Sequence, residues 1–310
     1  MKTIRTLATV IMAILLHFPL SADDPATKEN PQKETKSARG RPDHFLDLSW
    51  TGSDDGTSFA RGFLDDRILT IGDNLPLRNM IRYDRTSTKH DGIPPHLYRF
   101  SDTIMAQNDD WLFVGRIGSS SDRLFHDSEA LEAMIVGGMR IFHSGPHSLY
   151  GAILYSHENY FHLKYNVPIP FLFYGFKNDF LTASVGLPTF VFLKITPTLT
   201  FNFTFIPIFD IESGLKYRPL PFLSFGPEFI WKSDRYFITS PQPSDHRYYH
   251  EYLHLLVKVQ SYITMNVGAY ISGGYAFIDR YYDGKRSYDR HHIITEKQSI
   301  IANIGFQLFL

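Results

Sequence analysis

Histidines that recur every fourth residue are the first candidates for chemistry in this chain. At this spacing His246, His250 and His254 share one face of either a strand or a helix. In a strand, residues four apart lie about 13 Å from one another, which is too far for neighbours to bind one zinc ion. The residues from 253 to 265 alternate between apolar and polar types, which predicts a strand. We therefore expect a polar surface here, with neither a metal site nor a cofactor.

A base and a hydroxyl group also lie close together in the sequence. His126, Ser128 and Glu132 are the residue types that a nucleophilic hydrolase uses. The serine run at 118–122 lacks the Gly-x-Ser-x-Gly frame that marks a hydrolase nucleophile. The simpler interpretation of this region is a polar turn that leads into a strand near 133. We expect that the chain is not an enzyme, and a hydrolase at this position is a distant alternative.

Ionisable and amide residues on the polar faces of long alternating segments form a third group. Within segments of membrane-spanning length, such residues commonly mark a water-filled path or pair with one another. Both signs of charge occur, so a pore built from them would not be strongly ion-selective. A satisfied polar network inside a barrel too narrow to conduct is the other interpretation. The lumen-lining candidates are Arg140, Asp210, Glu228, His250, His254, Lys258 and Gln260.

Extended segments must position these residues. At 199–205 the odd-numbered residues are Leu and Phe while the even-numbered ones are Thr and Asn, and 250–264 has the same asymmetry over a longer run. Several segments match the roughly 9 to 11 residues of a tilted membrane-spanning strand, whereas most soluble strands have about 5 to 6. Ten strands are predicted near 111–117, 133–143, 148–156, 167–176, 180–187, 198–210, 222–232, 250–264, 266–280 and 299–310. Weaker strand candidates occur at 45–50, 68–71 and 79–83.

The predicted fold is all-β, an antiparallel up-and-down transmembrane barrel. After residue 22 no window approaches 18 consecutive apolar residues, so helical membrane spans are not expected. A chain that crosses lipid without helices must close its sheet, because every backbone N–H and C=O in hydrocarbon needs a partner. An exported soluble β-sandwich is the alternative fold. Barrels made from one bacterial chain have even strand numbers, which favours twelve strands, with ten as the alternative.

The N-terminal residues predict an export signal followed by a polar leader. Lys2 and Arg5 precede an apolar run at 7–16, and the small residues Ser21 and Ala22 follow, in the order of a secretory signal peptide. We predict a signal peptide over 1–22, a disordered periplasmic leader over 23–43 and the barrel over 44–310. The polar stretches at 233–249 and 279–297 are predicted as extracellular loops, and 282–284 as a turn.

Composition excludes several classes of protein. The chain has 310 residues and no cysteine, so it can form neither a disulfide nor a lipid-modified cysteine. Its net charge of −1 becomes −3 without 1–22, because Lys2 and Arg5 are the charged residues of that segment. Neither value indicates a nucleic-acid partner. The abundance of aromatic residues, with 26 Phe, 18 Tyr and 3 Trp, favours strands and membrane interfaces.

The chain resembles outer-membrane β-barrel proteins of diderm bacteria, in particular porin-like families of unknown function. The resemblance lies in the segments at 2–22, from 111 onward and at 300–310. The proline-containing pair at 167–175 and 185–188 is similar to strand pairs of such barrels. The resemblance implies export to the outer membrane, contact with its lipid and passive passage of small hydrophilic solutes. A non-conducting structural or surface-interaction barrel is the alternative, and a lipid hydrolase at the barrel rim is a distant one. The sequence leaves the oligomeric state open.

Overall fold

The computed structural model describes residues 43–71, 75–126, 130–157, 167–186, 188–206, 210–239, 247–284 and 292–309. The predicted signal peptide and all of the predicted leader except Asp43 lie outside these ranges, as do His246 and Ser128. Within the described ranges, no helix is long and apolar enough to cross a membrane.

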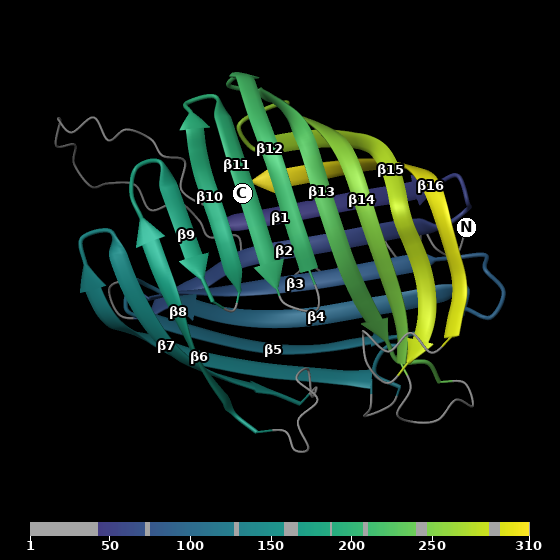
Figure 1. The fold of residues 1–310 in the computed structure, drawn as a ribbon, viewed down its shortest axis with the longest axis horizontal. Coiled ribbons are helices and arrows are strands. Elements are labelled where there is room, and N and C mark those ends of the chain that lie inside the picture. The colour runs from purple at the N-terminus through teal and green to yellow at the C-terminus, as the bar shows by residue number, and fades with distance from the viewer. Residues whose placement is uncertain are drawn as a thin grey trace, which may run out of the picture. The chain divides into compact units, whose positions relative to one another are not determined.

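The described residues form sixteen strands in a single closed sheet (Figure 1). Each strand pairs antiparallel with the next strand in the chain, and the last strand pairs with the first over nine residue pairs from Phe45↔Phe309 to Ser53↔Ile301. The strands are β1 (His44–Ser53), β2 (Ser58–Ile71), β3 (Leu75–Ser87), β4 (His96–Gln107), β5 (Trp111–Ser121), β6 (Leu131–Ser144), β7 (His147–Ser156), β8 (Ile169–Lys177), β9 (Leu181–Val185), β10 (Thr189–Thr196), β11 (Leu199–Ile206), β12 (Asp210–Leu220), β13 (Leu223–Tyr236), β14 (Arg247–Tyr262), β15 (Val267–Gly284) and β16 (His292–Phe309). The predicted class, an antiparallel up-and-down barrel, is confirmed.

The predicted number of strands, about twelve or ten, is wrong. The weak candidates at 45–50, 68–71 and 79–83 belong to β1, β2 and β3, and the strands that the sequence analysis missed are β4, β10 and β12. In β4 and β12 charged residues, Gly or Pro interrupt the apolar alternation on which the prediction relied. These strands persist because backbone pairing with both neighbours holds them in the sheet, whatever their side chains.

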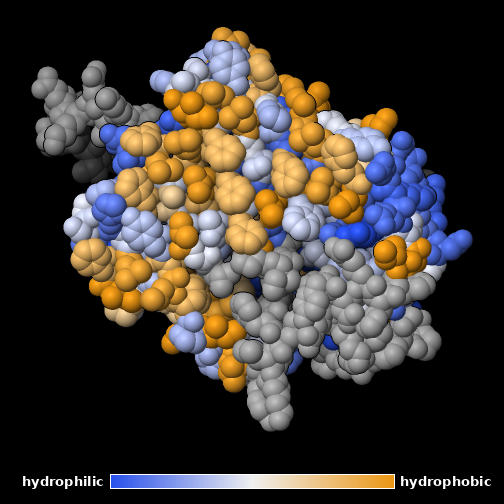
Figure 2. All heavy atoms as spheres, viewed as in Figure 1, coloured by the Kyte–Doolittle hydropathy of each residue, from blue (hydrophilic) through white to orange (hydrophobic). Residues whose placement is uncertain are grey.

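The outer wall of the barrel is apolar. Large apolar side chains that point outward are strongly exposed, such as Leu172 on β8 at 62%, Leu255 on β14 at 46% and Ile271 on β15 at 59%. Figure 2 shows hydrophobic residues covering the wall that faces the viewer, whereas hydrophilic residues gather toward the right-hand end. A continuous exposed apolar band is unfavourable in water and is the surface that a bilayer requires.

The two ends of the barrel differ in the lengths of their connections. Connections after even-numbered strands are two to four residues long. We call the barrel end that carries them the turn end, and it also holds His44 and Phe309. Connections after odd-numbered strands have three to twelve residues and form the loop end. The predicted loops at 233–249 and 279–297 are too long and the predicted turn at 282–284 is wrong, because β13 continues to Tyr236 and β15 to Gly284. Backbone pairing alone carries these strands past the apolar band, so no hydrophobic pattern marks their ends.

Two neighbouring residues in the middle of β11 test the orientation of the wall. Phe203 faces outward and Asn202 faces the lumen, where it lines a cavity. We expect Phe203→Arg to impair insertion into vesicles, because a cation at the lipid midplane costs about 2–4 kcal/mol. Asn202→Arg is the matched control and should insert almost as the unmodified chain does. The heat-modifiable gel shift of the folded barrel measures both, and equal defects would show that the register of β11 is wrong.

Candidate functional site

Strand register defines which side chains face the lumen. Residues that oppose one another in adjacent strands point to the same face of a sheet. One such row runs from Glu228 on β13 through Leu256, Gly274 and Ile301 to Ser53 on β1. The other face of the same strands carries the exposed apolar side chains of the outer wall. The even-numbered residues of β13 and β14 therefore point into the barrel.

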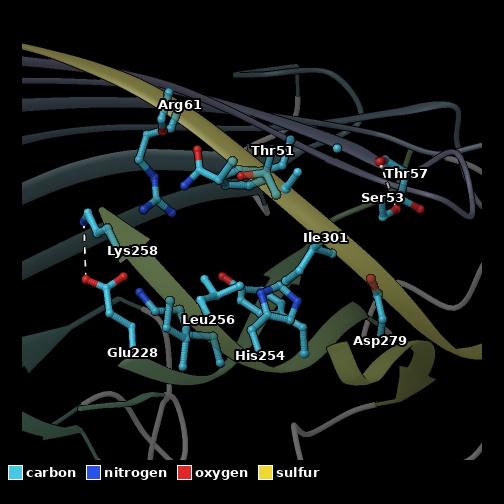
Figure 3. Close-up of a pocket in the computed structure, with 18 of the residues that line it drawn as sticks. Thr51, Ser53, Thr57, Arg61, Glu228, His254, Leu256, Lys258, Asp279 and Ile301 are labelled. Carbon is cyan, nitrogen blue, oxygen red and sulfur yellow. Dashed lines mark hydrogen bonds and ion pairs between the residues drawn. The ribbon is translucent and has the colours of Figure 1, made fainter. Parts of the chain in front are cut away.

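A cavity of about 270 Å³ lies in the lumen beside these strands (Figure 3). Four predicted candidates line it: Glu228, His250, His254 and Lys258. Lys258 lies 3.4 Å from Glu228, and Figure 3 shows Arg61 pointing into the cavity from the opposite side. The cavity therefore presents charges of both signs to whatever occupies it.

The other three predicted candidates lie elsewhere along the inner wall. Asp210 opposes Lys232, which lines the cavity, and its carboxylate is 3.7 Å from the Lys232 ammonium. Gln260 is buried and accepts a hydrogen bond from Lys216 at 2.8 Å. Arg140 lies at the turn end, where it forms an ion pair of 2.5 Å with Asp110. The predicted residues thus spread over most of the depth of the lumen.

Ion pairs occupy two opposite sides of the lumen. Arg61 on β2 and Arg82 on β3 both bind Asp84, at 3.0 and 2.6 Å. On β12 and β13, Lys232 forms an ion pair with Glu212, a carboxylate that also interacts electrostatically with the two arginines. A solute in this part of the lumen would meet arginines paired with Asp84 on one side and carboxylates paired with Lys232 on the other.

One ion pair joins the two walls directly. The Nη1 atom of Arg99 on β4 donates to Oδ1 of Asp234 on β13 at 2.6 Å, and both side chains are nearly inaccessible to solvent. Arg99 also lies over the ring of Tyr236, with 5.6 Å between its Cζ atom and the ring centroid. Buried charges are costly unless paired, so the two walls are held together where this pair forms.

The chain beyond β13 continues this contact at the loop end. Phe237 forms a parallel bridge with Ser121 at the end of β5, and its N–H donates to the Ser120 carbonyl at 2.8 Å. Thr239 donates to the Asp122 carboxylate at 2.8 Å. Seven strands separate β5 from β13 in either direction round the sheet, so these bonds cross the barrel at its full width. We call this cross-barrel contact, with the Arg99–Asp234 pair, the strap.

An apolar cluster packs beside the strap. Its members come from β4, β13, β14, β15 and two loop-end connections, and they are Ile93, Leu97, Tyr236, Ile238, Tyr248 and Tyr281. Several of these side chains are almost fully buried, which is unusual for the mouth of a barrel open to water. The cluster and the strap together narrow the loop end of the lumen.

A buried His–Asp–Tyr group lies at the loop-end side of the cavity, and its His250 and Asp279 line the cavity. His250 and Asp279 are joined by a 2.8 Å hydrogen bond, and the Tyr281 ring stacks on the imidazole with 4.2 Å between centroids. His254 shares the lumen face with His250, as their spacing predicts. Among the described residues, no group of three or more potential ligands could hold a metal ion.

At the loop end, the β1–β2 turn is fastened to the β3–β4 loop. Asp55 accepts a hydrogen bond from the Thr57 N–H at 2.8 Å and from the Ser53 hydroxyl, and it lies 3.4 Å from His90. Burial alone would raise the pKa of Asp55, but these hydrogen bonds and His90 outweigh it and lower the pKa. Asp55 therefore remains ionised at neutral pH and can hold His90.

The residues that the sequence analysis missed lie on β2–β4, where it recognised little structure. Arg61, Arg82 and Asp84 form the charged wall on this side of the lumen, and Arg99 supplies half of the ion pair in the strap. A signal was present, since Arg78, Arg82 and Asp84 occupy alternate positions of one run. Charged residues at alternate positions of a strand indicate a face that points into the lumen. They are as informative as apolar residues at alternate positions, which indicate a face that points toward lipid.

Solved outer-membrane barrels are similar to this chain in structure. A NanC porin aligns with 7% identity and a TM-score of 0.34, covering 86% of this chain and 100% of the porin. The KdgM porin aligns with 8% identity and a TM-score of 0.30 over 86% and 99% of the two chains. An outer membrane channel from Pseudomonas putida F1 aligns with 8% identity and a TM-score of 0.34 over 90% and 99%. No family model and no curated protein matches the chain, so its function is argued below from its own residues.

The strap can be tested by removing its ion pair in two steps. We expect Arg99→Leu or Asp234→Leu alone to lower the free energy of unfolding by about 3–5 kcal/mol, because each leaves a buried charge unpaired. The double variant should recover most of this loss. Urea titrations of the barrel in vesicles measure all three variants.

The exposed pair Arg67–Asp43, at 3.0 Å on the turn end, is the matched control. Removing it should change the free energy of unfolding by less than about 1 kcal/mol. Additive losses in the Arg99→Leu and Asp234→Leu double variant would contradict a direct bond between the two walls.

Proposed function

We propose that this chain is an integral outer-membrane protein that forms a passive channel for small solutes. The observation that carries the proposal is a closed sixteen-stranded barrel with an apolar outer wall and ionisable side chains facing its lumen. About eight strands already give a barrel that its own side chains can fill, and barrels of 16 to 18 strands leave room for an aqueous path. Sixteen strands are therefore more than a solid barrel needs.

The orientation follows from the lengths of the connections. Barrels of this kind keep short turns on the periplasmic side and longer loops outside the cell. The turn end, with connections of two to four residues and both ends of the sheet, is then periplasmic. The loop end, which carries the strap, faces the cell exterior. Lipid of the outer membrane is the partner of the apolar wall.

Charge placement supports passage of polar solutes with little preference for the sign of an ion. Arg61 and Arg82 face Glu212 and its neighbours, so the lumen holds cations and carboxylates at similar depth. A ring of one sign would select ions by charge, whereas facing groups of opposite sign orient dipolar solutes.

A barrel that does not conduct in its resting state is the second candidate, and the strap favours it. Arg99 and Asp234 close the distance between opposite walls, and the bridge from Phe237 to Ser121 reinforces the contact. A surface-interaction role would suit a barrel whose outer mouth is held shut.

We propose no enzymatic step. His126 lies in the β5–β6 connection and Glu132 in β6, while Ser128 lies outside the described residues, so the idea of a rim-sited lipid hydrolase stays a prediction.

Recordings in planar bilayers separate the two candidates. We expect the purified chain to give reproducible conductance steps, and the double variant Arg99→Leu/Asp234→Leu to give larger or more frequent ones, because it releases the strap. The double variant Arg67→Leu/Asp43→Leu, which removes an exposed pair at the turn end, should behave as the unmodified chain does. Folded protein that is silent with and without the strap pair would establish the non-conducting barrel instead.

A further inference from the structure

One part of the inner wall is apolar, unlike the charged part described above. It is formed by lumen-facing side chains of β7, β8 and β10, and we call it the apolar strip. Its members are Tyr150, Leu154, Phe171, Phe173, Phe190 and Phe192.

Register places the apolar strip inside the barrel. Phe192 opposes Asn202, which lines the lumen cavity, and Phe190 opposes Ser184 on β9. Ser184 in turn opposes Gly175, on the same face of β8 as Phe173, and Phe173 opposes Tyr150. Their outward neighbours, such as Leu172 and Ile153, belong to the exposed apolar wall. The strands of this region are thus apolar on both faces.

The apolar strip is accessible from within the barrel. Phe190 and Phe192 point into the lumen that the closed sheet surrounds, yet 39% of the surface of Phe190 and 38% of that of Phe192 are exposed. Phe173 stacks on Tyr150 with 4.7 Å between centroids and an interplanar angle of 4°, so these two rings pack against each other. Exposed apolar surface inside a lumen is unfavourable in water and commonly marks a ligand groove.

Cations border the strip toward the turn end. Lys194 follows Phe192 by two residues on the same face of β10, about 7 Å away along the strand. Lys194 opposes Thr200, which opposes Lys216, so these three residues form one row across β10–β12. Lys177 also faces the lumen, at the end of β8. No described residue forms an ion pair with Lys177 or Lys194, and both are exposed.

We propose that the apolar strip and its bordering lysines form a binding site for small amphipathic anions, specifically monocarboxylates with an aromatic body. The ring would lie against Phe190 and Phe192, and the carboxylate would meet Lys194. Polar sugars would leave the phenylalanine surface wet, and neutral apolar molecules would leave Lys194 unpaired. The site rests on the proposed function for its purpose, since it names the class of solute that the channel passes.

Equilibrium dialysis of the folded full-length barrel in detergent tests the site without measuring conductance. The probe is radiolabelled 3-phenylpropionate, compared with 3-phenylpropanol, which lacks the charge, and with gluconate, which lacks the ring. We expect saturable binding of 3-phenylpropionate that is about tenfold tighter than that of either comparison compound. Phe192→Ser and Lys194→Gln should each weaken it about tenfold. Val191→Ser, at the outward-facing neighbour of Phe192, is the matched control and should bind as the unmodified chain does.

Each outcome decides the inference. Equal binding by the unmodified chain and the two variants, or equal binding of gluconate, would overturn the site. Because Lys194 is exposed, Lys194→Gln keeps the test valid if Phe192→Ser does not fold. Conductance without binding of 3-phenylpropionate would refute this site and leave the channel standing, whereas binding without conductance would refute the channel and leave the site.

Discussion

The requirement that every backbone N–H and C=O in hydrocarbon has a partner governs the whole molecule. An open sheet would leave two edges unpaired, so the chain must bring β1 and β16 together over the length of β1. Because the sheet is closed, an individual strand needs neither a high β-propensity nor a regular alternation of apolar and polar residues. It also forces each strand to divide its side chains between lipid and lumen, which is why one register determines the wall and the site together.

Within that closed sheet the interior is uneven. The lumen faces of β2–β4 and β12–β14 carry opposed charges around a cavity, whereas those of β7, β8 and β10 carry aromatic and aliphatic residues bordered by lysines. The inner wall therefore has a charged part and an apolar part, and its composition differs from one side of the barrel to the other.

The strap adds a constraint that acts across the barrel. Bonds from β13 and its extension to β4 and β5 join strands on opposite walls, and the apolar cluster packs beside them. Since the contact lies at the loop end, it narrows the lumen there, while the cavity lies beside the central part of the strands.

The sequence by itself determined the class of fold, because a period of two with an apolar face is a local property that long strands such as β14 display plainly. It also predicted seven lumen-lining residues, from Arg140 to Gln260. It did not reveal β4 or β12, whose alternation is interrupted, or β10, which is apolar on both faces; pairing with neighbours sustains all three strands. Only the tertiary structure brought Arg99 to Asp234, 135 residues apart, and Phe192 to the same lumen as Arg61. Contacts across a barrel depend on the number of strands and on the accumulated register, and neither is encoded in any one segment.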